Sequence, residues 1–351
     1  MAAGFHPYAW TLWLAASMAA VLLTRNPLYL FILLAALFFL YAALLRRAQR
    51  QPESMVGAQA WAWRRLVYLA LILGGFSIIF NALTVHAGER ALFALPDSWP
   101  VVGGPITWES IIYGFVTGLS FVSLILIFAI YNSVLGPQII LRMIPGFAYQ
   151  AGMAVSIAIS FAPQTLIAWG EIREAQRLRG RQGRGVRDLL PLFLSLLSHG
   201  LDRAIQLAES MEARGFGGRI TPVSPRETWL IRGGSILGLL ALLTGLFVRA
   251  YGSAASLGLG LLLLGGLLLA FSLWRSSRQV QRSRYRRWLW RPRDAVLMGG
   301  AGLLLAGVLL TAWLSPAALF YYPYPPYDLL PSFNSFLGLL FALPLLPALL
   351  M

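Results

Sequence analysis

Several apolar runs of about 20 residues, almost free of charge, divide this 351-residue sequence. At a rise of about 1.5 Å per residue, a helix of that length crosses the roughly 30 Å hydrocarbon layer of a bilayer. Hydrophobic residues make up 58% of the chain and charged residues 12%, which is more apolar surface than a water-soluble core can bury. Because unpaired backbone groups are not tolerated in lipid, the runs predict an all-α, polytopic protein of the cell membrane.

The runs predict about eight spanning helices, and the arginine-rich loops predict their orientation. Cationic loops are retained on the cytoplasmic side, so residues 46–65, with five arginines, and residues 275–293, with eight, should be cytoplasmic. Counting crossings then places residues 86–107 and 315–331 outside. The predicted spans are 8–24, 27–45, 66–85, 108–131, 229–248, 255–274, 295–314 and 332–350.

Residues 146–169 form a further apolar stretch. A full crossing there would put residues 171–219, with their nine arginines, outside. We therefore expect a helix that lies in or dips into the membrane and is interrupted near Pro163, since proline removes a backbone donor. The sequence thus predicts four segments: membrane helices with a cytoplasmic loop (1–65), a membrane core (66–170), a cytoplasmic helical region (171–219) and further membrane helices (220–351).

Composition excludes several kinds of chemistry. The net charge of +15 favours retention at the membrane over nucleic-acid binding. The chain holds no cysteine, so disulfides, thiolate ligands and cysteine nucleophiles are excluded. It also holds no lysine, so the phosphate loop G-x-x-x-x-G-K-[ST] is absent and ATP binding by this chain is not expected. His6, His86 and His199 fall in three different regions, so neither a shared metal site nor a cofactor is expected.

Other polar and small residues have ordinary interpretations. Glu109 lies near the outer loop, where we expect a solvated carboxylate. We assign His86 to an outer turn at Thr84–Gly88. The Leu/Gly runs at 236–246 and 257–269 contain small residues suited to close helix packing.

Two arginine-glycine sequences stand out in the cytoplasmic region: EIREAQRLRG at residues 171–180 and AESMEARGF at 208–216. Each predicts a helix that ends at a glycine, because glycine adopts turn conformations that strain other residues. An arginine beside such a turn can form forked hydrogen bonds to a second protein, which indicates a docking surface. The alternative is a pair of interfacial helices whose arginines lie near anionic lipid headgroups.

With these residues the sequence resembles the transmembrane T component of energy-coupling factor (ECF) transporters, a family that includes cobalt and nickel permease proteins. Residues 175–180 and 211–216 resemble its two Ala-Arg-Gly signatures. The second matches in full, whereas the first has Leu178 where the family has alanine. The resemblance covers about residues 65–219, and residues 228–274 look like an insertion relative to the family pattern.

The resemblance implies a subunit that is not an enzyme. Family members join two ABC-type ATPase subunits to a small substrate-binding membrane protein, the S component, for uptake of a vitamin or a transition-metal ion. The helices that end at Gly180 and Gly215 would be coupling helices, with Arg179, Arg214 and Ala213 at the ATPase contacts. The expected partners are therefore the two ATPases, an S component and membrane lipid.

Two other classes of protein remain as rivals. A stand-alone secondary transporter or channel is the main alternative, and it should carry buried ionisable residues within its spans. The predicted spans hold almost none. An intramembrane enzyme would need a nucleophile with a base, or a metal cluster, and no such set is evident in the sequence.

Overall fold

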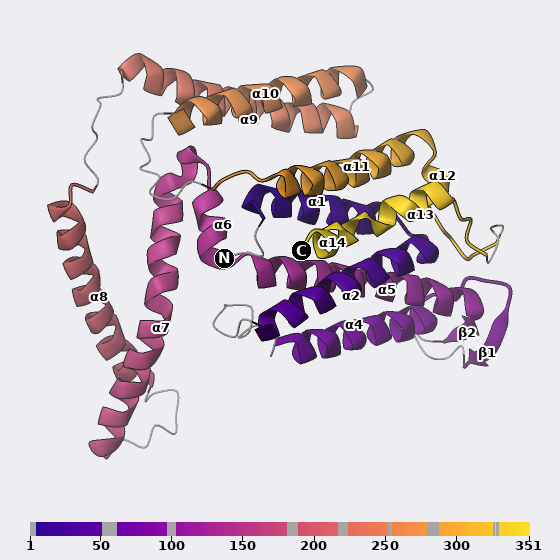
Figure 1. Ribbon diagram of the computed structural model, residues 1–351, viewed down its shortest axis with the longest axis horizontal. Helices are drawn as coiled ribbons and strands as arrows, with labels where there is room; N and C mark the ends of the chain where they lie inside the picture. The colour runs from indigo at the N-terminus through magenta and orange to yellow at the C-terminus, as the bar shows by residue number, and fades with distance from the viewer. Residues whose placement is uncertain are drawn as a thin grey trace. The chain divides into compact units, whose positions relative to one another are not determined.

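The computed structural model describes residues 5–50, 62–96, 103–180, 189–216, 224–251, 255–278, 288–325, 327 and 330–351 (Figure 1). Most of them are helical, as the sequence predicts. The chain divides into two compact units. Unit 1 comprises Met1–Ile140 and Arg286–Met351, and unit 2 comprises Leu141–Tyr285. The two units are defined by the packing of the helices. The four predicted segments are defined by membrane topology, so they stay a prediction.

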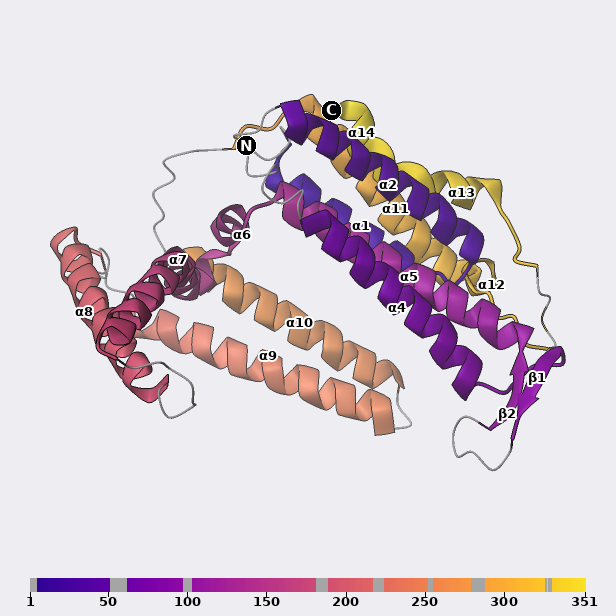
Figure 2. The ribbon, with the colours of Figure 1, turned by 90° about the horizontal axis from the view of Figure 1, so that it is seen from below.

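Unit 1 is a bundle of helices that run along a common direction (Figure 2). The short helix α6 (Pro137–Met143) leads from it into unit 2. The helices of unit 1 are α1 (Pro7–Leu23), α2 (Pro27–Arg50), α4 (Ala62–Thr84), α5 (Trp108–Val134), α11 (Pro292–Leu314), α12 (Pro316–Leu319), α13 (Ser335–Ala342), the 3-10 turn η3 (Leu343–Leu345) and α14 (Leu346–Leu350).

Helix α1 lies in the core of unit 1, where it packs against α5 and α11. Trp10 and Trp13 are fully enclosed by other side chains. The indole N–H of Trp13 donates to the carbonyl oxygen of Pro344 at 3.1 Å, which joins α1 to η3. The core of this unit is therefore built from protein side chains of helices distant in sequence.

The outer surface of unit 1 is apolar as well. On α4 the exposed side chains include Leu71, Ile72, Phe76 and Phe80, each more than half exposed. Water-soluble proteins seldom expose contiguous apolar surface of this kind. A lipid environment accounts for it, in agreement with a membrane protein.

A small β-hairpin interrupts the helical fold between α4 and α5. Strand β1 (Ala91–Leu95) pairs antiparallel with β2 (Gly104–Thr107), with Leu95 opposite Gly104 and Ala91 opposite Thr107. The side chain of Thr107 then caps the first turn of α5 by accepting from the N–H of Ser110. The sequence predicts only a loop here, so the hairpin is a local addition to a fold that is otherwise helical.

Unit 2 contains two helix pairs. They are α7 (Tyr149–Leu178), which follows the 3-10 turn η1 (Gly146–Ala148), with α8 (Leu189–Ala213), and α9 (Pro225–Tyr251) with α10 (Ala255–Arg278). Helices α9 and α10 lie side by side over their whole length in both views (Figures 1 and 2). The serine hydroxyl of Ser277 accepts from the N–H of Gly146 at 2.9 Å, which ties α10 to η1.

Among the described residues, six helices are long and apolar enough to cross a membrane. Five coincide with predicted spans: Pro27–Arg47, Trp108–Val134, Pro225–Tyr251, Ser256–Arg278 and Pro292–Leu314. The apolar parts of the other three predicted spans are shorter, at Pro7–Leu23, Tyr68–Thr84 and Ser335–Leu350. The multi-pass character is therefore supported, whereas the number of eight spans stays a prediction.

The sixth long helix, Gly146–Leu178, corrects the expected break at Pro163. Helix α7 is continuous through this proline. Proline removes one N–H donor, but the helical hydrogen bonds on both sides of it remain, and membrane helices tolerate such a residue. The prediction of an interrupted helix is wrong, and by length and composition this helix suffices for a full crossing.

Candidate functional site

The first arginine-glycine sequence forms the end of α7. Arg179 is the C-cap that follows the last helical residue, and its N–H donates to the carbonyl oxygen of Ala175 at 3.3 Å. Gly180 has φ +82°, and its N–H donates to the carbonyl oxygen of Arg177 at 3.0 Å. Only glycine adopts this left-handed conformation without strain. The predicted helix end at Gly180 is confirmed.

The second arginine-glycine sequence forms the end of α8, and here the whole terminating motif is described. Gly215 has φ +75°, and its N–H donates to the carbonyl oxygen of Glu212 at 2.8 Å. The N–H of Phe216 donates to the carbonyl oxygen of Met211 at 2.9 Å. These two bonds define a Schellman motif, which satisfies carbonyl groups that a helix end leaves without partners. The predicted helix end at Gly215 is also confirmed.

Both turns present an arginine to the exterior. Arg179 and Arg214 are exposed, as is Ala213 in the last turn of α8. Within the described part of the chain, neither guanidinium group forms a hydrogen bond or an ion pair. Their forked donors are therefore available to a second molecule, which is what a docking role requires.

Helix α8 lies between the two turns along the chain. It has 25 residues, which corresponds to about 38 Å. Its middle packs against α7, where the guanidinium carbon of Arg203 lies 5.3 Å from the ring centroid of Phe161. The turn at Gly180 therefore ends α7, and the turn at Gly215 ends α8. The length of α8 separates the two turns along the chain.

An apolar stripe runs along α8. Its side chains are spaced four or three residues apart, so they share one helix face, and each is at least half exposed. They are Leu190, Leu194, Leu197, Leu201 and Ile205. In unit 2 this face is not covered by another described helix, so it suits lipid or an apolar partner surface.

Helices α9 and α10 form a hairpin that includes residues 228–274, the predicted insertion. Small residues allow the two helices to pack closely against each other. The backbones approach so closely that a Cβ on Gly238 would lie 3.1 Å from the carbonyl oxygen of Gly265. Near one end, the hydroxyl groups of Ser235 and Ser272 lie 2.6 Å apart. The predicted close packing of the Leu/Gly runs is confirmed.

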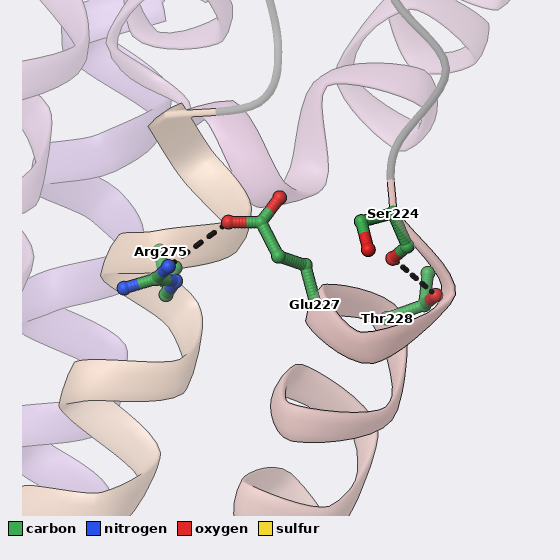
Figure 3. Close-up of polar contacts among 4 residues, drawn as sticks. All are labelled: Ser224, Glu227, Thr228 and Arg275. Carbon is green, nitrogen blue, oxygen red and sulfur yellow. Dashed lines mark hydrogen bonds and ion pairs between the residues drawn. The ribbon is translucent and has the colours of Figure 1, made fainter.

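An ion pair lies at the same end of this hairpin. The guanidinium of Arg275 on α10 donates to the carboxylate of Glu227 on α9 at 2.9 Å (Figure 3). The start of α9 is fixed by Thr228, whose hydroxyl donates to the carbonyl oxygen of Ser224. Both charged side chains are about 40% exposed, so we expect this pair to contribute little to stability.

Two carboxylates, Glu109 and Asp294, are buried, and the sequence alone does not indicate this burial. Asp294 in the first turn of α11 accepts from the N–H groups of His6 and Arg291, at 2.7 and 2.8 Å. Glu109 in the first turn of α5 is only 3% exposed, so the expectation of a solvated carboxylate is wrong. The turn before β1 lies against it, because the N–H of Arg90 donates to Oε1 and Gly88 lies beside Oε2.

The three histidines lie in separate places, and their surroundings differ. His6 caps α1, His86 follows the end of α4 within the assigned turn, and His199 lies on α8. Among the described residues, no group of three or more His, Cys, Asp or Glu side chains could hold a metal ion. The candidate site is therefore the pair of arginine-glycine turns.

No protein-family model and no curated protein matches this sequence. The resemblance to ECF T components thus stays a prediction that depends on the two signatures.

Proposed function

We propose that this chain is the transmembrane scaffold and energy-coupling subunit of an ECF-type ABC importer. In this role it links two ATPase subunits to a substrate-binding S component for uptake of a vitamin or a transition-metal ion. The observation that carries the proposal is the pair of exposed helix ends at Gly180 and Gly215. Each holds an arginine whose guanidinium group has no partner within the described residues.

A helix end with a free arginine is suited to transmit force between proteins. The Schellman turn holds the backbone at Gly215 in one conformation, so the direction of Arg214 at the helix end is restricted. A planar guanidinium then engages carboxylates or carbonyls of a partner through two parallel bonds. A movement of the partner is passed to a helix of 25 residues instead of being absorbed by a loop.

The buried ionisable side chains also favour a scaffold over the rival secondary transporter. Among the described residues, the buried carboxylates are Glu109 and Asp294, and each lies in the first turn of a helix. A transporter that moves ions by itself is expected to hold such groups near the middle of its spans. Their position at helix ends fits a subunit whose energy comes from a partner.

The test is charge reversal at both turns. In the double variant Arg179→Glu/Arg214→Glu, new carboxylates face the docking surfaces of the ATPases. Losing a charged partner at such an interface costs on the order of 2 to 5 kcal/mol, or about 30-fold or more in affinity. We expect normal membrane insertion, loss of ATPase co-purification and loss of substrate uptake in vesicles.

Arg226→Glu is the matched control. Arg226 is an exposed arginine in the first turn of α9, on the side predicted to be cytoplasmic, but it is not beside a terminating glycine. This variant should retain assembly and uptake. Full assembly and uptake in the double variant would refute the coupling role of the two turns.

A further inference from the structure

The end of unit 1 that holds the β-hairpin contains a buried carboxylate, Glu109, that has no ion-pair partner among the described residues. Oε1 of Glu109 accepts from the N–H of Arg90 at 3.3 Å. Oε2 is buried and has no hydrogen-bond partner among the described residues. Among the described residues, no basic side chain forms an ion pair with Glu109. Leaving a charged oxygen buried without a partner costs several kcal/mol. The partial positive charge at the N-terminal end of α5 offsets a part of this cost.

The backbone around this carboxylate is built to make room for it. Gly88 has φ +130°, and a Cβ added there would lie 2.6 Å from Oε2 of Glu109 and 3.0 Å from Cβ of Thr107. Thr107 donates its hydroxyl to the carbonyl oxygen of Ala87 at 2.7 Å, which holds the turn against β2. Oε2 therefore lies in a fixed backbone cradle, not in a loosely packed loop.

A second buried oxygen without a partner belongs to Tyr324. Its side chain is 5% exposed, and its hydroxyl has no hydrogen-bond partner among the described residues. The ring of Tyr324 lies 5.8 Å from that of Tyr113, which is one helical turn beyond Glu109 on α5. Burial, then the neighbouring Tyr322, Tyr113 and Glu109, raise the pKa of Tyr324 to about 12, so its hydroxyl keeps its proton.

The guanidinium of Arg25, which contacts Tyr113, is already engaged. Arg25 donates from Nη1 to the hydroxyl of Tyr113 at 2.7 Å, and its guanidinium carbon lies 5.8 Å from the centroid of the same ring. Its charge is thus directed at Tyr113 instead of the carboxylate of Glu109. The site offers hard oxygen atoms and a single carboxylate, and among the described residues it lacks the group of three His, Cys, Asp or Glu side chains that a transition-metal site needs.

We propose that Oε2 of Glu109, together with the hydroxyl of Tyr324, binds a monovalent metal cation such as Na⁺. Oxygen ligands suit a hard ion, and a single carboxylate balances a single positive charge. The bound ion fastens three segments that are distant in sequence: the turn at Gly88, the start of α5 and the segment that holds Tyr324. This site is separate from the arginine-glycine turns and does not depend on the proposed coupling function.

Thermal unfolding of the purified full-length protein tests the site. Ligand that binds only the folded state raises its stability by mass action. In buffers of equal ionic strength, replacing N-methyl-D-glucamine by Na⁺ should raise the unfolding temperature of the unmodified protein by on the order of 2 to 4 °C. The rise should grow with Na⁺ concentration and should vanish in Glu109→Gln, which removes the charge and keeps the shape.

Two further variants complete the experiment. Glu89→Gln removes an exposed carboxylate from the same turn and should respond to Na⁺ like the unmodified protein. Tyr324→Phe keeps the ring and should need more Na⁺ for the same rise. If the unmodified protein is indifferent to the cation, Oε2 binds water only and the proposal fails. It also fails if Glu109→Gln keeps the Na⁺ response or if Tyr324→Phe leaves it unchanged.

Discussion

At the scale of single residues, His6 joins the start of α1 to the start of α11. Its backbone N–H donates to Asp294, and its ring stacks on Trp290 with centroids 3.9 Å apart and planes 9° apart. Its Nδ1 atom accepts from the N–H of Tyr8 at 3.3 Å and so caps α1. Burial lowers the pKa of the imidazole, and the carboxylate of Asp294 opposes this shift in part.

This arrangement predicts a loss of stability in acid. Nδ1 accepts a hydrogen bond only when it carries no proton, and the lowered pKa means that the unfolded chain binds more protons. The contribution of His6 is therefore complete above the unfolded pKa of about 6.5 and is lost as the pH falls through the folded pKa. We expect His6→Asn, which keeps an acceptor for the cap, to lose less stability on acidification. Thermal unfolding across this range measures the difference, and parallel curves for both proteins would contradict it.

Where a residue's role depends only on the local backbone, the sequence predicts it. The ends at Gly180 and Gly215 follow from the conformational freedom of glycine after a helical pattern. The burial of Glu109 was not predictable, because it depends on the pairing of Ala91–Leu95 with Gly104–Thr107 across a connection of eight residues. The stack of Trp290 on His6 joins residues more than 280 positions apart, which a single sequence does not reveal.

At the scale of elements, the hairpin of α9 and α10 depends on glycines at its contact line. A Cβ on Gly238 would lie 2.8 Å from Cγ of Leu269 and 3.0 Å from its backbone nitrogen. Gly238→Val should therefore force the helices apart and destabilise the hairpin by about 1 to 3 kcal/mol. Gly260 has no atom within 4 Å of an added Cβ, so Gly260→Val is the control. Protease digestion of the protein in bilayers should cut the first variant faster, and equal rates would exclude close packing at Gly238.

Helix boundaries follow the apolar pattern, but the effect of each proline does not follow from its position in that pattern. Pro163 was expected to break α7, and the helix continues through it. The C-terminal run 332–350 was expected to be one helix, and the structure divides it into α13, η3 and α14. The division falls at Pro344 and Pro347, where two missing N–H donors three residues apart favour a tighter 3-10 turn. A proline alone thus does not tell whether a helix bends, tightens or continues.

At the scale of the whole molecule, the apolar helices and the two arginine-glycine turns serve different needs. The long helices require lipid as their solvent, which the composition alone predicts. The turns offer a positive charge and a fixed backbone geometry to a partner. Their positions follow from the sequence signatures and do not depend on how the helices pack. The division into two units was not predictable, because it depends on the return of Arg286–Met351 to the bundle of the first 140 residues.

The central claim is that the two turns contact ATPase subunits, and site-specific cross-linking tests it most directly. The natural chain has no cysteine, so each single-cysteine variant carries one reactive thiol. Leu178 is 86% exposed and Phe216 is 49% exposed, and replacing either by cysteine leaves the neighbouring arginine in place.

With co-expressed ABC-type ATPase subunits in membranes, a thiol-to-amine reagent should join Leu178→Cys and Phe216→Cys to these subunits. The controls are Arg226→Cys and Arg249→Cys, at the two ends of α9, which should give no such product. ATPase adducts at positions 178 and 216 alone are the predicted result. Absence of adducts at both positions, or equal adducts at the controls, would contradict the account.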